Sequence, residues 1–227
     1  MYSWFYKLVY KCSFGAFKKK LSLLQHGWSL MVSKDSWLVQ SGYVRSFLES
    51  RAVDFNGNPL PWMNYGMIGF LSERLNSSLN VFEYGSGNST FFLAGYVNKV
   101  VSIEYDAKWF DRIKENIINN NILNIEYIYC SLKDNYQEQI LRQDFFFDIV
   151  VVDGRHRVEC AKNALDKLTP NGILILDDSN REKYKPVFEY FISKGFAYLT
   201  FSGLKPTGFG TDFSTIFYRR SENIFGL

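Results

Sequence analysis

The chain has 227 residues, of which 47% are hydrophobic and 22% charged, as expected for one globular domain with an appendage. Three widely spaced cysteines, Cys12, Cys130 and Cys160, argue against a disulfide framework or a C-x-x-C metal site and favour a reducing compartment. The sequence has neither an apolar run of about 18 residues nor a signal-peptide pattern, so we expect a cytoplasmic protein.

Basic charge gathers in the N-terminal segment. Residues 1–52 contain eight Lys and Arg against two acids, so the net charge of +3 divides into +6 there and −3 in the remainder. The remainder is therefore not expected to bind nucleic acid. We expect residues 1–52 to form a basic, aromatic-rich helical extension and residues 53–227 to form the main domain.

Apolar residues of this extension recur at roughly helical spacing, among them Phe17, Leu21 and Leu24. One interpretation is a helix that packs on the main domain or on a second subunit. The other is a helix that lies on an anionic membrane surface, with Lys18–Lys20 toward the lipid headgroups. His26 is interpreted as a structural or surface residue.

The main domain opens with an Asn-Gly turn and two prolines, followed by a helix that starts at Trp62 or Asn64. Strands and helices then alternate. Strands are expected at 80–84, 99–105, 124–130, 147–153, 172–178, 196–203 and 213–220, and helices at 89–96, 107–120, 134–143, 157–168 and 181–195. This order predicts an α/β fold with a doubly wound, Rossmann-like, mostly parallel seven-stranded sheet that ends in an antiparallel hairpin.

Polar residues follow five of these strands, at residues 83–89, 104–106, 130–132, 153–157 and 177–181. In a doubly wound sheet, ligands bind in the crevice beyond the carboxyl ends of the strands. Gly85 and Gly87 would let the backbone approach a ligand closely. Glu104 lies 21 residues after Glu83, at a spacing suited to binding ribose hydroxyls.

The charge of the glycine loop distinguishes between nucleotide ligands. The third glycine of G-x-G-x-x-G is absent, because Thr90 stands in its place. Glu83 in the turn would repel a pyrophosphate and favour a cationic ligand. The residues therefore favour S-adenosylmethionine over a nicotinamide dinucleotide.

Four stretches in this order, VFEYGSGNST, VVSIEYD, FDIVVVDGRHR and GILILDDSNR, resemble class I S-adenosylmethionine-dependent methyltransferases. The resemblance covers about residues 50–220 and is closest to a bacterial group with an E-[YF]-G-S-G-N-S-T loop. The D-G-x-H element is similar to that of sugar-modifying O-methyltransferases. The resemblance implies that the cofactor is contacted by Glu83, Gly85, Ser86, Gly87, Asn88, Ser89, Glu104, Tyr105, Ser131 and Asp153. Of these, Ser131 would lie near the adenine.

Methyl transfer to a hydroxyl group needs an aligned acceptor and a base that removes its proton. His156, three residues beyond the fourth main strand, has an ordinary pKa suited to that role, and Asp153 is the alternative base. His156 could instead begin the next helix and contact backbone, or only orient the substrate.

Two further roles are open at the same strand ends. Asp153, Asp177 and Asp178 resemble the Mg²⁺-binding positions of catechol-type O-methyltransferases. Alternatively, Asp178 caps the next helix and Asp177 binds loop amides. Arginine side chains in this region could grip an acidic substrate such as a uronate or phosphosugar, which makes the expected substrate contacts Arg155, Arg157, Asp178 and Arg181.

The sequence thus predicts an S-adenosylmethionine-dependent methyltransferase (EC 2.1.1.-) that methylates a small molecule or glycan, with O-methylation by in-line transfer as the expected reaction. The alternatives are a binding module of the same fold without catalysis, and a nicotinamide-dependent oxidoreductase. The acceptor would be selected by residues 1–65 and 203–212, whose sequences do not identify it.

Overall fold

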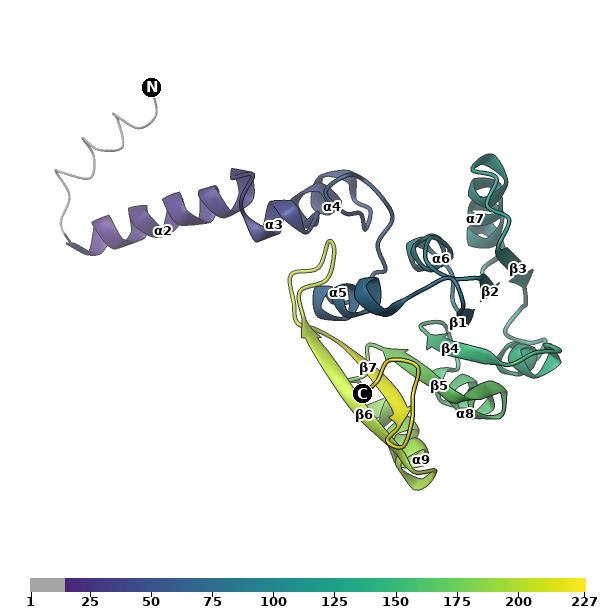
Figure 1. Ribbon diagram of the computed structural model, residues 1–227. Helices are drawn as coiled ribbons and strands as arrows, with labels where there is room; N and C mark the ends of the chain where they lie inside the picture. The colour runs from purple at the N-terminus through teal and green to yellow at the C-terminus, as the bar shows by residue number, and fades with distance from the viewer. Residues whose placement is uncertain (1–14) are drawn as a thin grey trace.

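A seven-stranded sheet forms the centre of the molecule in the computed structural model, which describes residues 15–227 and the side chains from residue 18 onward (Figure 1). The strands are β1 (Asn80–Tyr84), β2 (Lys99–Glu104), β3 (Ile125–Tyr129), β4 (Phe147–Val152), β5 (Leu168–Asp177), β6 (Phe196–Gly203) and β7 (Asp212–Arg219). Their order is β3-β2-β1-β4-β5-β7-β6. The first five strands are parallel, and β7 is antiparallel to both β5 and β6. The predicted fold class is therefore confirmed.

Helices precede and connect the strands. The α-helices are α2 (Gly15–Val32), α3 (Trp37–Gln40), α4 (Tyr43–Glu49), α5 (Tyr65–Arg74), α6 (Asn88–Ala94), α7 (Ala107–Asn119), α8 (Arg157–Ala164) and α9 (Lys185–Ser193). The 3₁₀ helices are η1 (Tyr136–Arg142), η2 (Leu165–Lys167) and η3 (Glu182–Tyr184).

The helix expected at 134–143 is the 3₁₀ helix η1, which follows Asn135 in a left-handed conformation with φ of 56°. One expected boundary was wrong. Strand β5 begins at Leu168, before Pro170, instead of at residue 172. Its pairing with β4 shifts register between Phe147 and Ile149, and this irregularity accommodates a proline inside a central strand.

The sheet is covered on both faces, as the near-continuous apolar sequences of β4 and β5 predict. On one face, Phe82 and Tyr84 pack with residues of η1, α8 and α9. On the other face, Val81 packs with residues of α5 and α6. Neighbouring residues of β1 therefore contribute to different cores. On the second face, α5 begins after Asn64, whose side chain accepts a hydrogen bond from the backbone N–H of Met67.

Strand β1 pairs with both β2 and β4, so the chain changes its direction of winding at this strand. This is the switch point at which a doubly wound sheet leaves a crevice outside the carboxyl ends of its strands. The fold consequently brings together the residues that follow β1, β2, β4 and β5.

The N-terminal helices form an arm. Figure 1 shows α2 extending away from the sheet, whereas α4 lies beside the loop between β6 and β7. The Ser46 hydroxyl donates to Val53 O at 2.8 Å, and the Tyr43 hydroxyl donates to Gly208 O at 2.9 Å. The boundary between residues 52 and 53 stays a prediction. The part of the expected extension before Gly15 lies outside the described residues. Within residues 15–227, no helix is both long enough and apolar enough to cross a membrane.

Candidate functional site

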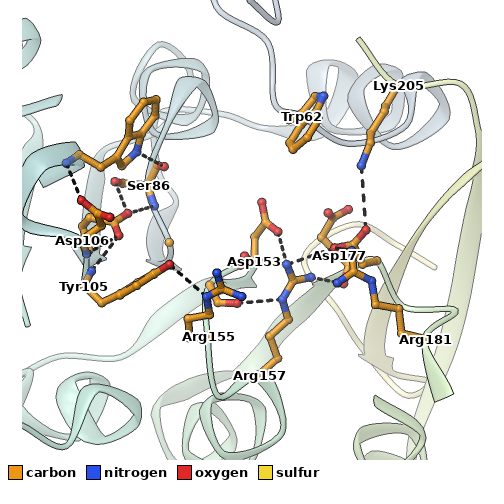
Figure 2. A pocket seen from close by; sticks show the side chains of 15 residues that line it. Trp62, Ser86, Tyr105, Asp106, Asp153, Arg155, Arg157, Asp177, Arg181 and Lys205 are labelled. Carbon is orange, nitrogen blue, oxygen red and sulfur yellow. Dashed lines mark hydrogen bonds and ion pairs between the residues drawn. The ribbon is translucent and has the colours of Figure 1, made fainter. Parts of the chain in front are cut away.

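A cavity of about 510 Å³ opens at the carboxyl ends of β1, β2, β4 and β5 (Figure 2). Its lining includes both acidic and basic side chains. The lining residues are Trp62, Gly85, Ser86, Glu104, Tyr105, Asp106, Trp109, Asp153, Gly154, Arg155, Arg157, Asp177, Asp178, Arg181 and Lys205. The structure therefore unites residues from four of the five polar strand ends that the sequence singled out.

Two glycines shape the floor of this cavity. Gly85 has φ of +90°, and a Cβ at this position would lie 2.9 Å from the Cα of Gly154. A Cβ on Gly154 would lie 2.2 Å from the Tyr136 hydroxyl oxygen. The turns after β1 and β4 thus approach each other too closely for side chains, and they leave bare backbone facing the cavity.

Glu83 does not line the cavity; its side chain is buried beneath the glycine loop. Its carboxylate accepts hydrogen bonds from Ser89, Thr90 and Ser102 at 2.5, 2.6 and 2.7 Å. Burial raises the pKa of Glu83 from 4.5 to about 7, although the three hydroxyl hydrogen bonds act in the opposite direction. Glu83 therefore holds the glycine loop from below, although the sequence predicted that it would contact a cofactor directly. Repulsion of a pyrophosphate would have to come from other acids.

Glu104 reaches the cavity from the end of β2. Its Oε1 atom accepts from the backbone N–H groups of Tyr105 and Asp106 at 2.8 and 2.9 Å. Its Oε2 atom accepts from the backbone N–H of Ser86 at 3.2 Å and from the Ser86 hydroxyl at 2.9 Å. The Ser86 hydroxyl also lies 2.7 Å from the Tyr127 hydroxyl, so it has a second partner available.

Four other expected cofactor residues do not line the cavity. Gly87 donates its N–H to the Thr90 hydroxyl at 3.1 Å, and Ser89 donates to Glu83. The Asn88 side chain donates to Ala52 O at 2.6 Å and so ties α6 to the N-terminal segment. The Ser131 hydroxyl accepts from the backbone N–H of Lys133 at 3.2 Å. These residues hold the loops around the cavity in place.

Arg157 has structural partners instead of the expected free guanidinium. Only 8% of its side chain is exposed, and the guanidinium lies 2.7 Å from the Asp153 carboxylate and 3.3 Å from that of Asp178. It also donates to the backbone carbonyls of Asp153, Gly154 and Asp177. These bonds join the turns after β4 and β5, so Arg157 is unsuited to gripping a substrate (Figure 2).

The carboxylates of Asp153, Asp177 and Asp178, which the sequence suggested as metal ligands, lie close together. Their ligand oxygens lie within 4.8 Å of one another. Burial raises the pKa of Asp153, against the lowering effect of Arg157, and burial followed by the charge of Asp153 raises the pKa of Asp177. Asp177 also accepts from the Ser214 hydroxyl at 2.7 Å.

Cationic side chains compensate this acidic cluster. Arg157 contacts two of its members, and Arg181 lies 2.7 Å from Asp178. Lys205 lies 3.9 Å from Asp178 and 3.0 Å from Asp212. The oxygen ligands have the chemistry that Mg²⁺ prefers, but a divalent ion would have to displace these ion pairs.

The two expected bases lie in different places. Asp153 lines the cavity. His156 is exposed at the start of α8, in a left-handed conformation with φ of 50°, and is not among the lining residues. The structure therefore brings Asp153, but not His156, to the cavity.

Several lining residues were missed by sequence reasoning. Trp109 has the helical spacing of an apolar face with Ile113 and Ile117, but its indole N–H donates to Ser86 O at 2.9 Å. Lys205 lies 4.3 Å from the ring centre of Trp62, whose indole N–H donates to Pro206 O at 2.7 Å. A glycine directly after the fourth strand could have indicated Gly154, whereas no local pattern indicates Trp62 or Lys205.

Comparisons with known proteins define the fold. No protein-family model and no curated protein matches the chain. An rRNA methylase from Streptococcus thermophilus is similar at 20% identity, with 67% of this chain and 93% of that chain covered and a TM-score of 0.52. A protein from Streptococcus mutans described as a candidate methyltransferase, in complex with SAH, is similar at 16% identity over 66% and 94% of the two chains, with a TM-score of 0.51.

A third similar structure is the precorrin-6y C5,15-methyltransferase from Geobacter metallireducens. It is 13% identical, with 66% of this chain and 86% of that chain covered and a TM-score of 0.52. At these identities the similarity concerns the fold alone. The chain therefore has the fold of the class I S-adenosylmethionine-dependent methyltransferases.

Proposed function

We propose that this protein is an S-adenosylmethionine-dependent methyltransferase that methylates a hydroxyl group of a small molecule or glycan. The observation that carries the proposal is the position of Glu104 opposite the Gly85–Ser86 turn, at the switch point of a methyltransferase-type sheet. A carboxylate at this place suits ribose hydroxyls, and the bare turn suits close approach of a ligand.

The residues present fit such a cofactor. Both oxygens of Glu104 already accept hydrogen bonds, but the Ser86 hydroxyl could yield its place to a ligand hydroxyl because Tyr127 is an alternative partner. Trp109, Tyr105 and Trp62 supply aromatic surface around the cavity. Glu104 and Asp106, on the β2 side of the cavity, favour a cationic ligand over one with a pyrophosphate group.

The bound cofactor would supply an electrophilic methyl group on a sulfonium. The chain would then need to align the acceptor and accept its proton. We assign the proton to the carboxylate of Asp153, because this side chain lines the cavity and burial raises its pKa above the ordinary value of an aspartate. Arg157 would hold Asp153 in position through the 2.7 Å ion pair.

His156 offers a direct comparison with Asp153. Glycine suits the left-handed backbone at His156, so His156→Gly should fold normally. If Asp153 is the base, Asp153→Asn should lower the rate of methyl transfer by about 100-fold or more while His156→Gly retains it. Loss of transfer in a well-folded His156→Gly variant would return the role to His156.

An acidic acceptor is favoured by the cations at the rim. Arg181 is half-exposed, and Arg155 donates to the Tyr105 hydroxyl at 3.1 Å while remaining exposed. Side chains of this type bind carboxylates and phosphates well. A uronate or phosphosugar therefore belongs among the first acceptors to test.

Calorimetry with S-adenosylhomocysteine and with NAD⁺ tests the cofactor. We expect binding of the first only, weakened at least tenfold by Glu104→Gln and unchanged by the exposed control Glu115→Gln. Binding of NAD⁺ alone would overturn the proposal. A screen with labelled S-adenosylmethionine over glycans, phenols and small acids then tests transfer, and binding without any transfer would favour a non-catalytic module.

A further inference from the structure

Helix α2 carries an uncovered apolar face. Leu24, Trp28 and Met31, at positions i, i+4 and i+7, lie on one side of the helix and are 70%, 70% and 40% exposed. Val32, beside them, is 53% exposed. Figure 1 shows this helix extending away from the sheet, so the main domain does not bury these side chains.

The charge of α2 indicates what could cover this face. The helix contains three consecutive lysines, Lys18–Lys20, and no acidic residue. Lys19 and Lys20 are exposed, and Lys20 lies one turn before Leu24, along the edge of the apolar face. A second copy of α2 would offer these lysines no acidic partner, whereas an anionic lipid surface would.

We propose that α2 lies on an anionic membrane surface, with Leu24, Trp28 and Met31 in the boundary between headgroups and acyl chains. A lysine beside an apolar face that contains Trp and Leu is typical of helices that bind in the plane of a lipid interface. The lysine side chains would contact the headgroup phosphates, each strengthening the attraction to anionic lipid. The exposure of this face does not fit the interpretation that the helix packs on the main domain, and the absence of acidic residues from α2 favours lipid over a second copy of the helix.

The helix is connected to the cavity through its neighbours. Phe47 of α4 contacts Phe209, with ring centres 4.9 Å apart. Phe209 belongs to the loop between β6 and β7, which also supplies Lys205 to the cavity. A membrane-bound α2 would therefore hold the rim of the cavity near the lipid surface.

Flotation of the full chain with vesicles tests the proposal. We expect binding to phosphatidylcholine vesicles that contain phosphatidylglycerol, little binding to phosphatidylcholine alone, and weaker binding at high salt. Lys19→Gln/Lys20→Gln should lower the partition coefficient about 30-fold. Lys133→Gln/Lys185→Gln removes the same charge from exposed sites elsewhere and should have no such effect.

A second variant pair tests the apolar face. Leu24→Ser/Trp28→Ser should abolish flotation, whereas Leu123→Ser, at a site that is 86% exposed, should retain it. Absence of flotation by the unmodified chain, or equal flotation of all variants, would overturn the proposal. Sedimentation equilibrium provides the other decisive outcome, because a dimer that Leu24→Ser/Trp28→Ser dissociates would make α2 an interface between copies.

Discussion

The Tyr136 hydroxyl lies directly beneath Gly154, at 2.2 Å from where a Cβ on that glycine would be. This hydroxyl is buried and has no hydrogen-bond partner within residues 18–227. The backbone turn after β4 therefore packs against the hydroxyl end of the Tyr136 side chain. This contact limits how closely the turn can approach Tyr136 and so helps to fix the position of the turn at the cavity.

This contact predicts a rescue. Gly154→Ala should destabilise the fold by about 2 kcal/mol through overpacking, and Tyr136→Phe should recover part of that loss by removing the clashing oxygen. Recovery should be incomplete, because Gly85 N and Tyr84 C also lie 3.1 Å from the new Cβ. Urea unfolding of the two single variants and the double variant measures the coupling, and strictly additive costs would contradict it.

The buried carboxyl of Glu83 predicts a pH-dependent stability. Its folded-state pKa is raised from 4.5 to about 7, so the folded protein binds the proton more tightly than the unfolded chain. The stabilisation that comes from proton binding by Glu83 is therefore full below pH 4.5 and is lost as the pH rises through about 7. The free energy of unfolding should fall by about 3 kcal/mol over this range.

Glu83→Gln should flatten this part of the stability profile. Urea unfolding between pH 5 and 8 compares the variant with the unmodified chain, and Glu126→Gln, with a side chain that is 43% exposed, serves as the control. An unchanged slope in Glu83→Gln would show that other groups carry the pH dependence.

Two arginines at the same cavity should differ sharply in their effect on stability. Arg157→Ala leaves Asp153 without its ion-pair partner and removes several hydrogen bonds, so we expect a loss of about 3 to 5 kcal/mol. Arg181→Ala removes a half-exposed side chain and should cost less than about 1 kcal/mol. Thermal unfolding measures both, and similar costs would refute the structural role of Arg157.

The ion pairs of the acidic cluster predict insensitivity to divalent metal. Because Arg157, Arg181 and Lys205 already contact Asp178, neither EDTA nor Mg²⁺ should shift the melting temperature of the unmodified protein. A stabilising shift with Mg²⁺ that disappears in Asp178→Asn would instead support a metal site.

Local patterns in the sequence were sufficient for the sheet but not for the direction of each side chain. The apolar runs identified the buried strands, and the polar strand ends located the crevice. A glutamate in a glycine turn, however, gives the same sequence pattern whether its side chain faces a ligand or lies beneath the loop, as that of Glu83 does. Trp109 fits an apolar helical spacing and nevertheless turns toward Ser86.

Long-range contacts account for the rest. Lys205 and Trp62 lie far apart along the chain, and only the return of the β6–β7 loop brings them to the cavity. Arg157 likewise follows the glycine turn in sequence, but two of its partners, the Asp177 carbonyl and the Asp178 carboxylate, come from the end of β5.

The position of β7 between β5 and β6 has a consequence for synthesis on the ribosome. Strand β6 leaves the exit tunnel before β7, the strand that joins it to the sheet. Until β7 (Asp212–Arg219) emerges, the nascent chain exposes an unpaired edge of β5 and a detached β6. A ribosome that stalls within this interval would leave two strands with open edges, which are targets for chaperones and sites of aggregation.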